Sequence, residues 1–177
     1  YITNYIEGHL PKDEWYDEYF SFINDIDLAN RLKIEFQNAR FIYKLFEGMQ
    51  AADELLLAEV RTQIIMYVSI YEALIHYILF EYYKDSQEVK DLIEKPTTIQ
   101  ISIPEEKKKA LQKALNHDGK EIIPYYIKKK ARDITKIRFD EKCMAANNLN
   151  LIDNDLTSEL IELYEMRNAV HIHAEIR

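Results

Sequence analysis

One short segment near the end of this 177-residue chain concentrates groups that bind phosphate and transfer protons. Within seven residues it contains Arg167, Asn168, His171 and His173. A guanidinium presents fixed donors that match a phosphate in bidentate fashion, and a histidine changes its charge near neutral pH. This combination is suited to holding a phosphate and moving protons beside it.

The same arginine lies on what its neighbours predict to be the buried face of a helix. Apolar residues recur there at spacings of three, four or seven: Leu156, Leu160, Leu163, Val170 and Ala174. At about 100° per residue Arg167 falls inside this stripe, and His171 lies roughly 40° from it. A charge on such a line requires a partner, a polar cleft or a subunit seam.

The roles of the neighbouring residues stay open. His171 is suited to act as general base on a ribose 2′-hydroxyl or as general acid to the leaving oxygen. His173 lies about 120° from Arg167 on an unbroken helix, so it needs a helix end or a second chain to take that role. Asn168 points about 100° from Arg167, towards a dimer seam or RNA. The alternative for each of these residues is an ordinary surface or core position in the helix, without a part in chemistry.

Two polar residues interrupt the most apolar stretch, for which we expect a helix spanning about Asp53 to Tyr83. Glu72 and His76 lie one turn apart on it. Glu72 is expected to orient Arg167 or a histidine; the alternative is a buried ion pair with no catalytic purpose.

These segments resemble HEPN domains (higher eukaryotes and prokaryotes nucleotide-binding). Residues 165–173 are similar to the family's signature helix, in which an arginine, a polar residue and, after a spacer, a histidine follow one another. Residues 65–75 are similar to its long apolar helix, with Glu72 as the embedded acid. His171 follows Arg167 after three residues and His173 after five, so which of them is the motif histidine is open.

The resemblance implies an all-α antiparallel helical bundle, a single domain over 1–177 with 1–30 as a helical N-terminal extension. It further implies a homodimer joined through the last helices, whose composite site cleaves RNA by 2′-hydroxyl attack without metal or other cofactor. Such proteins are similar to toxins and effectors of defence systems, often with a neutralising protein partner.

Composition fits a helical globular protein. The chain has 47% hydrophobic and 31% charged residues, only three glycines and four prolines, and Cys143 as its single cysteine. We expect Cys143 to be a small buried residue in a cytoplasmic protein. Ser69, Glu72 and His76 interrupt the longest apolar run, so no membrane span is expected. The sequence contains no metal-ligand spacing and no phosphate-binding glycine loop.

The net charge of −8 is unevenly distributed. Residues 105–142 contain twelve Lys/Arg and seven Asp/Glu, a local excess of five positive charges. We expect RNA to bind there, through Lys128, Lys129, Lys130 and Arg132 beside two tyrosines. The alternative is a solvated helix face.

Hydrophobic periodicity, together with residues that end helices, predicts the remaining elements. Helices are expected from Pro11 towards Gly48, around 88–94, 105–115, 121–132 and 139–148, and from 153–155 onward, with Asp155 or Thr157 as the last helix's cap. Residues 97–104 alternate like a strand, which would pair with another subunit or stay irregular.

Two further classes of function remain. One is a non-catalytic HEPN-like module for dimerisation or for binding RNA or another ligand. The other is an ordinary helical regulatory domain in which the motif is coincidental.

Overall fold

The structure is a computed structural model that describes residues 1–115 and 118–169. These residues are mostly helical with one two-stranded antiparallel sheet, so the prediction of a mostly helical protein with a short β segment is confirmed. They separate into two compact units, whereas the sequence led us to expect one domain. We call Tyr1–Lys84 together with the chain from Arg138 onward the helical unit, and Asp85–Ile137 the ribbon unit.

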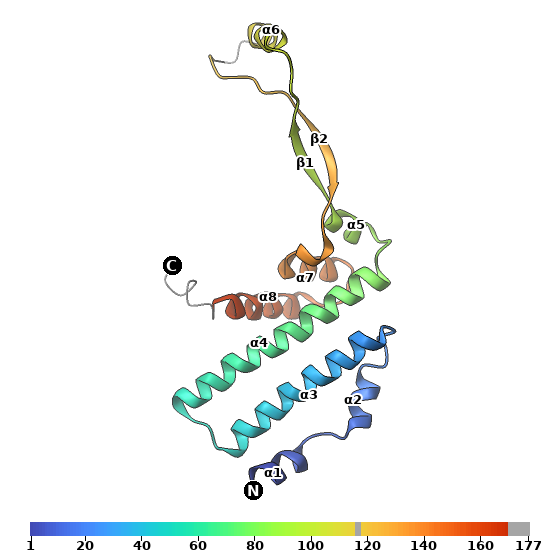
Figure 1. Cartoon of the computed structure of the whole chain (residues 1–177), viewed down its shortest axis with the longest axis vertical. Coiled ribbons are helices and arrows are strands. Elements are labelled where there is room, and N and C mark those ends of the chain that lie inside the picture. Colours follow the sequence, from blue (N-terminus) through green and yellow to red (C-terminus); the bar gives the residue numbers. More distant parts are fainter. Residues whose placement is uncertain (116–117, 170–177) are drawn as a thin grey trace. The chain divides into compact units, whose positions relative to one another are not determined.

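The helical unit is built around one long helix. In Figure 1, α4 (Asp53–Tyr77) lies between α3 (Ile26–Gly48) and α8 (Asn154–Ala169), and it packs against both. The other elements of this unit are α1 (Ile2–His9), α2 (Asp13–Tyr19), the π-helical turn η1 (Ile78–Tyr82) and α7 (Phe139–Asn148).

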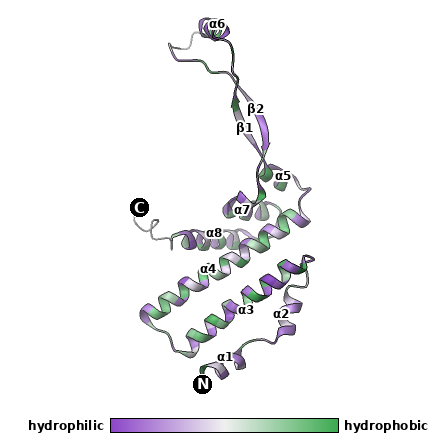
Figure 2. Ribbon diagram, in the orientation of Figure 1, coloured by the Kyte–Doolittle hydropathy of each residue, from purple (hydrophilic) through white to green (hydrophobic). Residues whose placement is uncertain are grey.

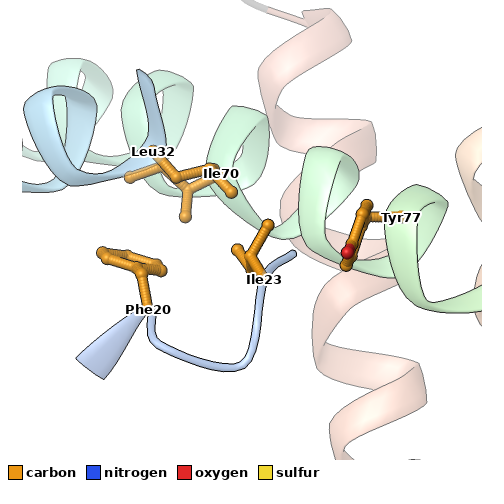
Figure 3. Close-up of a cluster of buried hydrophobic side chains, with 5 residues drawn as sticks. All are labelled: Phe20, Ile23, Leu32, Ile70 and Tyr77. Carbon is orange, nitrogen blue, oxygen red and sulfur yellow. The ribbon is translucent and has the colours of Figure 1, made fainter. Parts of the chain in front are cut away.

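One core lies between α3, α4 and the turn that precedes α3. Its buried members are Phe20, Ile23, Leu32, Ile70 and Tyr77, which Figure 3 shows converging from these elements. The Tyr77 hydroxyl accepts a hydrogen bond from the backbone N–H of Asn24 at 2.9 Å, so the polar end of this buried ring is satisfied. This contact fixes the turn to the end of α4.

The opposite side of α4 packs against α7 and α8. Buried residues from the three elements and η1 include Val68, Leu79, Phe139, Cys143 and Leu160. Burial raises the pKa of the Cys143 thiol to about 12, so the group is protonated and inert at neutral pH. The expectation of a small buried cysteine is confirmed.

Continuous helix extends from Asp53 to Tyr82, close to the expected span, because η1 continues α4 without a break. By length and composition this is the one helix in the described part of the chain that is long and apolar enough to cross a membrane. Core helices of soluble proteins share both properties, and this one packs on two sides. Figure 2 shows the hydrophobic colouring along it.

The caps of three helices are formed by side chains that precede them. Asp25 accepts from Leu28 N at 3.0 Å, and Ser86 accepts from Val89 N at 3.2 Å. The cap expected for α8 was wrong: Asp153 accepts from Leu156 N at 2.8 Å, because the helix begins at Asn154.

The ribbon unit comprises α5 (Gln87–Ile93), β1 (Glu94–Gln100), α6 (Glu105–Leu115), β2 (Tyr125–Ala131) and the 3₁₀ turn η2 (Ile134–Lys136). Strands β1 and β2 pair from Glu94↔Ala131 to Gln100↔Tyr125, and α6 lies at the far end of this ribbon in Figure 1.

Two sequence predictions fail in this unit. The helix expected over residues 121–132 is largely strand β2, and the strand expected at 97–104 begins earlier, at Glu94, and pairs within its own chain. The run of Tyr125, Tyr126 and Ile127 favours a strand, and the β1 backbone supplies its hydrogen-bond partners. The lysines that follow were interpreted as helical, but an exposed strand accommodates them equally well.

Candidate functional site

The centre of the candidate site is an ion pair that joins α4 to α8. Arg167 Nη1 donates to Glu72 Oε2 at 2.8 Å, across 95 residues of sequence. The two side chains are 26% and 31% exposed, so the pair lies at the edge of the core and remains in contact with solvent. The guanidinium carbon also lies 5.1 Å from the centre of the Tyr164 ring, within range of a cation–π interaction.

The helical spacing of α8 explains why Arg167 faces α4. Thr157 and Leu160 are buried, and Tyr164 and Arg167 continue the same line at spacings of four and three. Arg167 therefore faces inward as its spacing predicted, but the inward line contains Thr157 in place of the expected Leu156, which is 37% exposed. The carboxylate opposite it is Glu72, the acid that was expected to orient it.

A second basic residue lies close to the same carboxylate. Lys142, from α7, is almost fully buried, and burial lowers its pKa, while the negative charge of Glu72 opposes that shift. Glu72 thus interacts with Arg167 through a direct hydrogen bond and with Lys142 through electrostatic attraction. One carboxylate balances two basic groups contributed by two different helices.

His76 completes this group on α4. Burial lowers the pKa of its imidazole and the Lys142 charge lowers it further, while Glu72, one turn earlier, opposes both. Its ring lies 4.7 Å from that of Phe80. His76 is therefore held in its neutral form to lower pH than an exposed histidine, a form in which it can accept a proton.

Sequence reasoning missed Lys142, although its position contained a signal. Phe139, Lys142, Cys143 and Ala146 follow one another at spacings of three, one and three, which places all four on one helix face. All four are buried. The argument that singled out Arg167, a charge on an apolar stripe, applies equally to Lys142.

The other predicted catalytic residues are placed only in part. Asn168 is half-buried on α8, directly after Arg167. His171 and His173 lie outside the described residues, so their relation to Arg167 stays a prediction.

The four predicted RNA-binding residues do not share one surface. Side chains alternate along a strand, so Lys128 and Lys130 lie on one face of the ribbon and Lys129 on the other. Lys129 Nζ lies 3.6 Å from Glu94 Oε2 on that second face. Arg132 follows β2, where its backbone N–H donates to Ile93 O at 2.9 Å and its Nη1 to Leu92 O at 3.4 Å.

The first face of the ribbon combines positive charge with an aromatic ring. Tyr126, Lys128 and Lys130 lie opposite Ile99, Thr97 and Lys95, respectively, and none of these six residues is acidic. Two like charges directly opposite each other destabilise a ribbon.

No cluster of three or more histidine, cysteine or acidic side chains that could hold a metal occurs among residues 1–115 and 118–169. The polar groups that the candidate site contains are the guanidinium of Arg167, the carboxylate of Glu72, the amine of Lys142 and the imidazole of His76. Comparison of the chain with protein-family models, with curated proteins and with solved structures gives no significant match. Any function is accordingly inferred from these groups and their geometry.

Proposed function

We propose that this protein is a HEPN-type endoribonuclease that acts as a homodimer and needs no metal. The observation that carries the proposal is the setting of Arg167, which is held in place by Glu72 and Tyr164 yet remains a quarter exposed. A guanidinium that two neighbouring side chains fix, while part of it stays exposed to solvent, is suited to bind a phosphate.

In this proposal Arg167 holds the scissile phosphodiester and stabilises the charge that develops on its non-bridging oxygens. The 2′-oxygen of the preceding ribose attacks phosphorus, and the bond from phosphorus to the 5′-oxygen breaks. One imidazole removes the proton from the 2′-hydroxyl, and a second protonates the departing 5′-oxygen. The products are a 2′,3′-cyclic phosphate and a 5′-hydroxyl.

His171 is the preferred proton-transfer residue and His173 the alternative, because His171 is expected on the same helix face as Arg167. Two imidazoles acting on one phosphate are most simply supplied by two copies of the chain. Met166 on α8 is 43% exposed beside Arg167, which gives this part of the helix an apolar group to bury in such a pair. The proposed setting is the cytoplasm, as a toxin or defence effector with a neutralising protein partner.

A second candidate function is a non-catalytic HEPN-like module that dimerises or binds RNA. It is favoured by the Arg167–Glu72 bond itself, since that contact provides the arginine with a carboxylate inside one chain. In this alternative the pair joins α8 to α4 and has no role in chemistry.

The test is incubation of the purified protein with labelled mixed-sequence RNA in EDTA, followed by analysis of the product ends. Chelation stops enzymes that depend on two bound metals, while the proposed mechanism continues. Arg167→Ala is expected to lower the rate about 10²–10³-fold, as loss of a transition-state donor does in other enzymes. His171→Ala is expected to lower it about 10²–10⁴-fold and His173→Ala less.

Arg31→Ala is the matched control. Arg31 also bonds a glutamate, Glu35, at 2.8 Å, but on an exposed surface of α3. This variant should cut RNA at the wild-type rate. Absence of cleavage by the wild-type protein, or equal rates for the Arg167 and Arg31 variants, would refute the nuclease. A monomer in sedimentation at tens of micromolar protein would refute the composite dimer.

A further inference from the structure

A cavity of about 410 Å³ lies between α3 and α4, and it is separate from the group around Arg167. Its lining residues are Arg40, Tyr43, Lys44, Gln63 and Tyr67. The lining thus combines two cations, two phenol rings and one amide. Cavities of this size hold small ligands, and a few convergent polar groups normally fix the orientation of what is bound.

Arg40 is the unusual member of this lining. Its guanidinium carbon lies 5.7 Å from the Trp15 ring centre and 5.9 Å from that of Phe36, so aromatic rings hold it. No carboxylate among the described residues forms an ion pair with it, whereas Lys44 Nζ bonds Glu47 Oε2 at 2.5 Å. The cavity therefore contains one positive charge that no acidic side chain neutralises within the described residues.

Three buried polar atoms at this place also lack a hydrogen-bond partner among the described residues. They are Arg40 Nε, Gln63 Oε1 and the Tyr16 hydroxyl oxygen. The amide nitrogen of Gln63 donates to Ala39 O at 3.1 Å, which fixes that side chain. Burial raises the pKa of the Tyr16 hydroxyl, and the Arg40 guanidinium opposes the shift through its charge and its proximity as a hydrogen-bond donor, so Tyr16 supports Arg40 from behind the cavity wall.

Unsatisfied buried groups are costly, and natural proteins retain few of them without a reason. Of these three residues, Arg40 both lines the cavity and carries a charge that no described acidic side chain neutralises, so a ligand that suits the site carries negatively charged acceptors. A phosphate group meets that need, because it carries charge and several acceptor oxygens. The phenol rings of Tyr43 and Tyr67 offer surfaces for a planar group attached to it.

From this geometry we propose that the cavity binds a small phosphate ester of the size of a nucleoside monophosphate. Its phosphate would accept from Arg40, and its planar base would lie against the tyrosines. The site is distinct from the proposed nuclease, because Gln63 and Glu72 are nine residues apart on α4 and therefore point about 180° away from each other.

The test is thermal unfolding of the full chain with each of four probes: inorganic phosphate, a mixture of nucleoside 5′-monophosphates, uncharged nucleosides and a short oligoribonucleotide. The monophosphates are expected to raise the Tm by roughly 5–10 °C at a hundredfold excess over their Kd. Inorganic phosphate should raise it less and nucleosides scarcely at all. A larger effect of the oligonucleotide would instead identify an RNA end as the ligand.

Arg40→Met retains much of the apolar stem over Trp15 but removes the charge, and it should abolish the shift. Arg31→Met, a change of the same kind at an exposed position of the same helix, should leave the shift unchanged. Tyr43→Ala, at an exposed lining position, provides a second variant should Arg40→Met fail to fold. The proposal is overturned if no probe raises the Tm, or if the Arg40 and Arg31 variants respond alike. Arg167→Ala should still bind, so the two proposals fail independently.

Discussion

The helical unit and the ribbon unit place their charged residues in opposite settings. In the helical unit Arg167, Glu72 and Lys142 are half-buried or buried, and neighbouring side chains fix them. In the ribbon unit Lys128 and Lys130 stand exposed on a strand with no buried residue. The first setting positions one charge with accuracy, whereas the second adds several charges along a surface. Chemistry at a single phosphate needs the first, and retention of a long polyanion is served by the second.

The two units also differ in how they are held together. Every helix of the helical unit contributes at least one buried side chain, whereas β1 and β2 expose every residue except Ile99, which is half-buried. A two-stranded ribbon without a core is marginal by itself. Substitutions should therefore act on stability in the helical unit and on binding in the ribbon unit.

The largest expected effect is on the free energy of unfolding, which should depend on side chains of the helical unit far more than on those of the ribbon. Leu160→Ala removes a side chain that is 2% exposed, and it should lower the free energy of unfolding by about 2–5 kcal/mol. Ile127→Ala changes a residue that is 75% exposed and should lower it by less than about 0.5 kcal/mol. Urea unfolding of both variants checks this. A large loss for Ile127→Ala would mean that the ribbon face is covered.

The next prediction concerns the two faces of the ribbon. Lys128→Glu with Lys130→Glu should weaken RNA binding across all sequences and reduce the slope of log affinity against log salt by about 1.4, two contacts on a single strand. Lys129→Glu should have little effect, since Lys129 lies on the opposite face beside Glu94. Titrations between about 50 and 200 mM salt measure both slopes. Equal losses in the two variants would remove the distinction between the faces.

A smaller effect is expected from the ion pair in the helical unit. Glu72→Gln leaves Arg167 with a neutral partner and Lys142 without its nearest opposing charge, so the unfolding free energy should fall by about 1–3 kcal/mol. A double-mutant cycle with Arg167→Met isolates the direct pair, whose coupling should be about 1 kcal/mol because both side chains are partly exposed. A coupling of zero would indicate that Glu72 mainly serves Lys142.

The smallest predicted effect is a pH dependence from His76. Its folded-state pKa lies below the ordinary value of 6.5, so between these two values the unfolded chain binds more protons. This contribution to stability is therefore present above pH 6.5 and is lost as the pH falls through that window. His76→Gln should flatten this part of the stability curve. Matching curves for wild type and His76→Gln would contradict the assigned burial.

The sequence predicted the helical unit well because periodicity reports directly on helix packing. The spacing of α8 predicted that Arg167 faces inward, and Glu72, the acid embedded in the most apolar part of the long helix, was the partner expected for it. The ribbon was harder to predict, because Tyr125–Lys130 has no strict alternation and its pairing with β1 depends on distant residues, from Gln100↔Tyr125 to Lys95↔Lys130. Lys142 was missed because a lysine within a basic stretch resembles a surface residue until the helix face is drawn.

The hydrogen bond from Arg132 N to Ile93 O has a consequence for how this protein could have been assembled. It brings together two residues 39 positions apart, one directly before β1 and one directly after β2. The chain between them is thereby closed into a loop. A segment with adjoining ends can be lengthened, shortened or exchanged without moving the elements that precede and follow it. The ribbon thus has the form of an interchangeable insert, which can vary in length and sequence while the helices keep their arrangement.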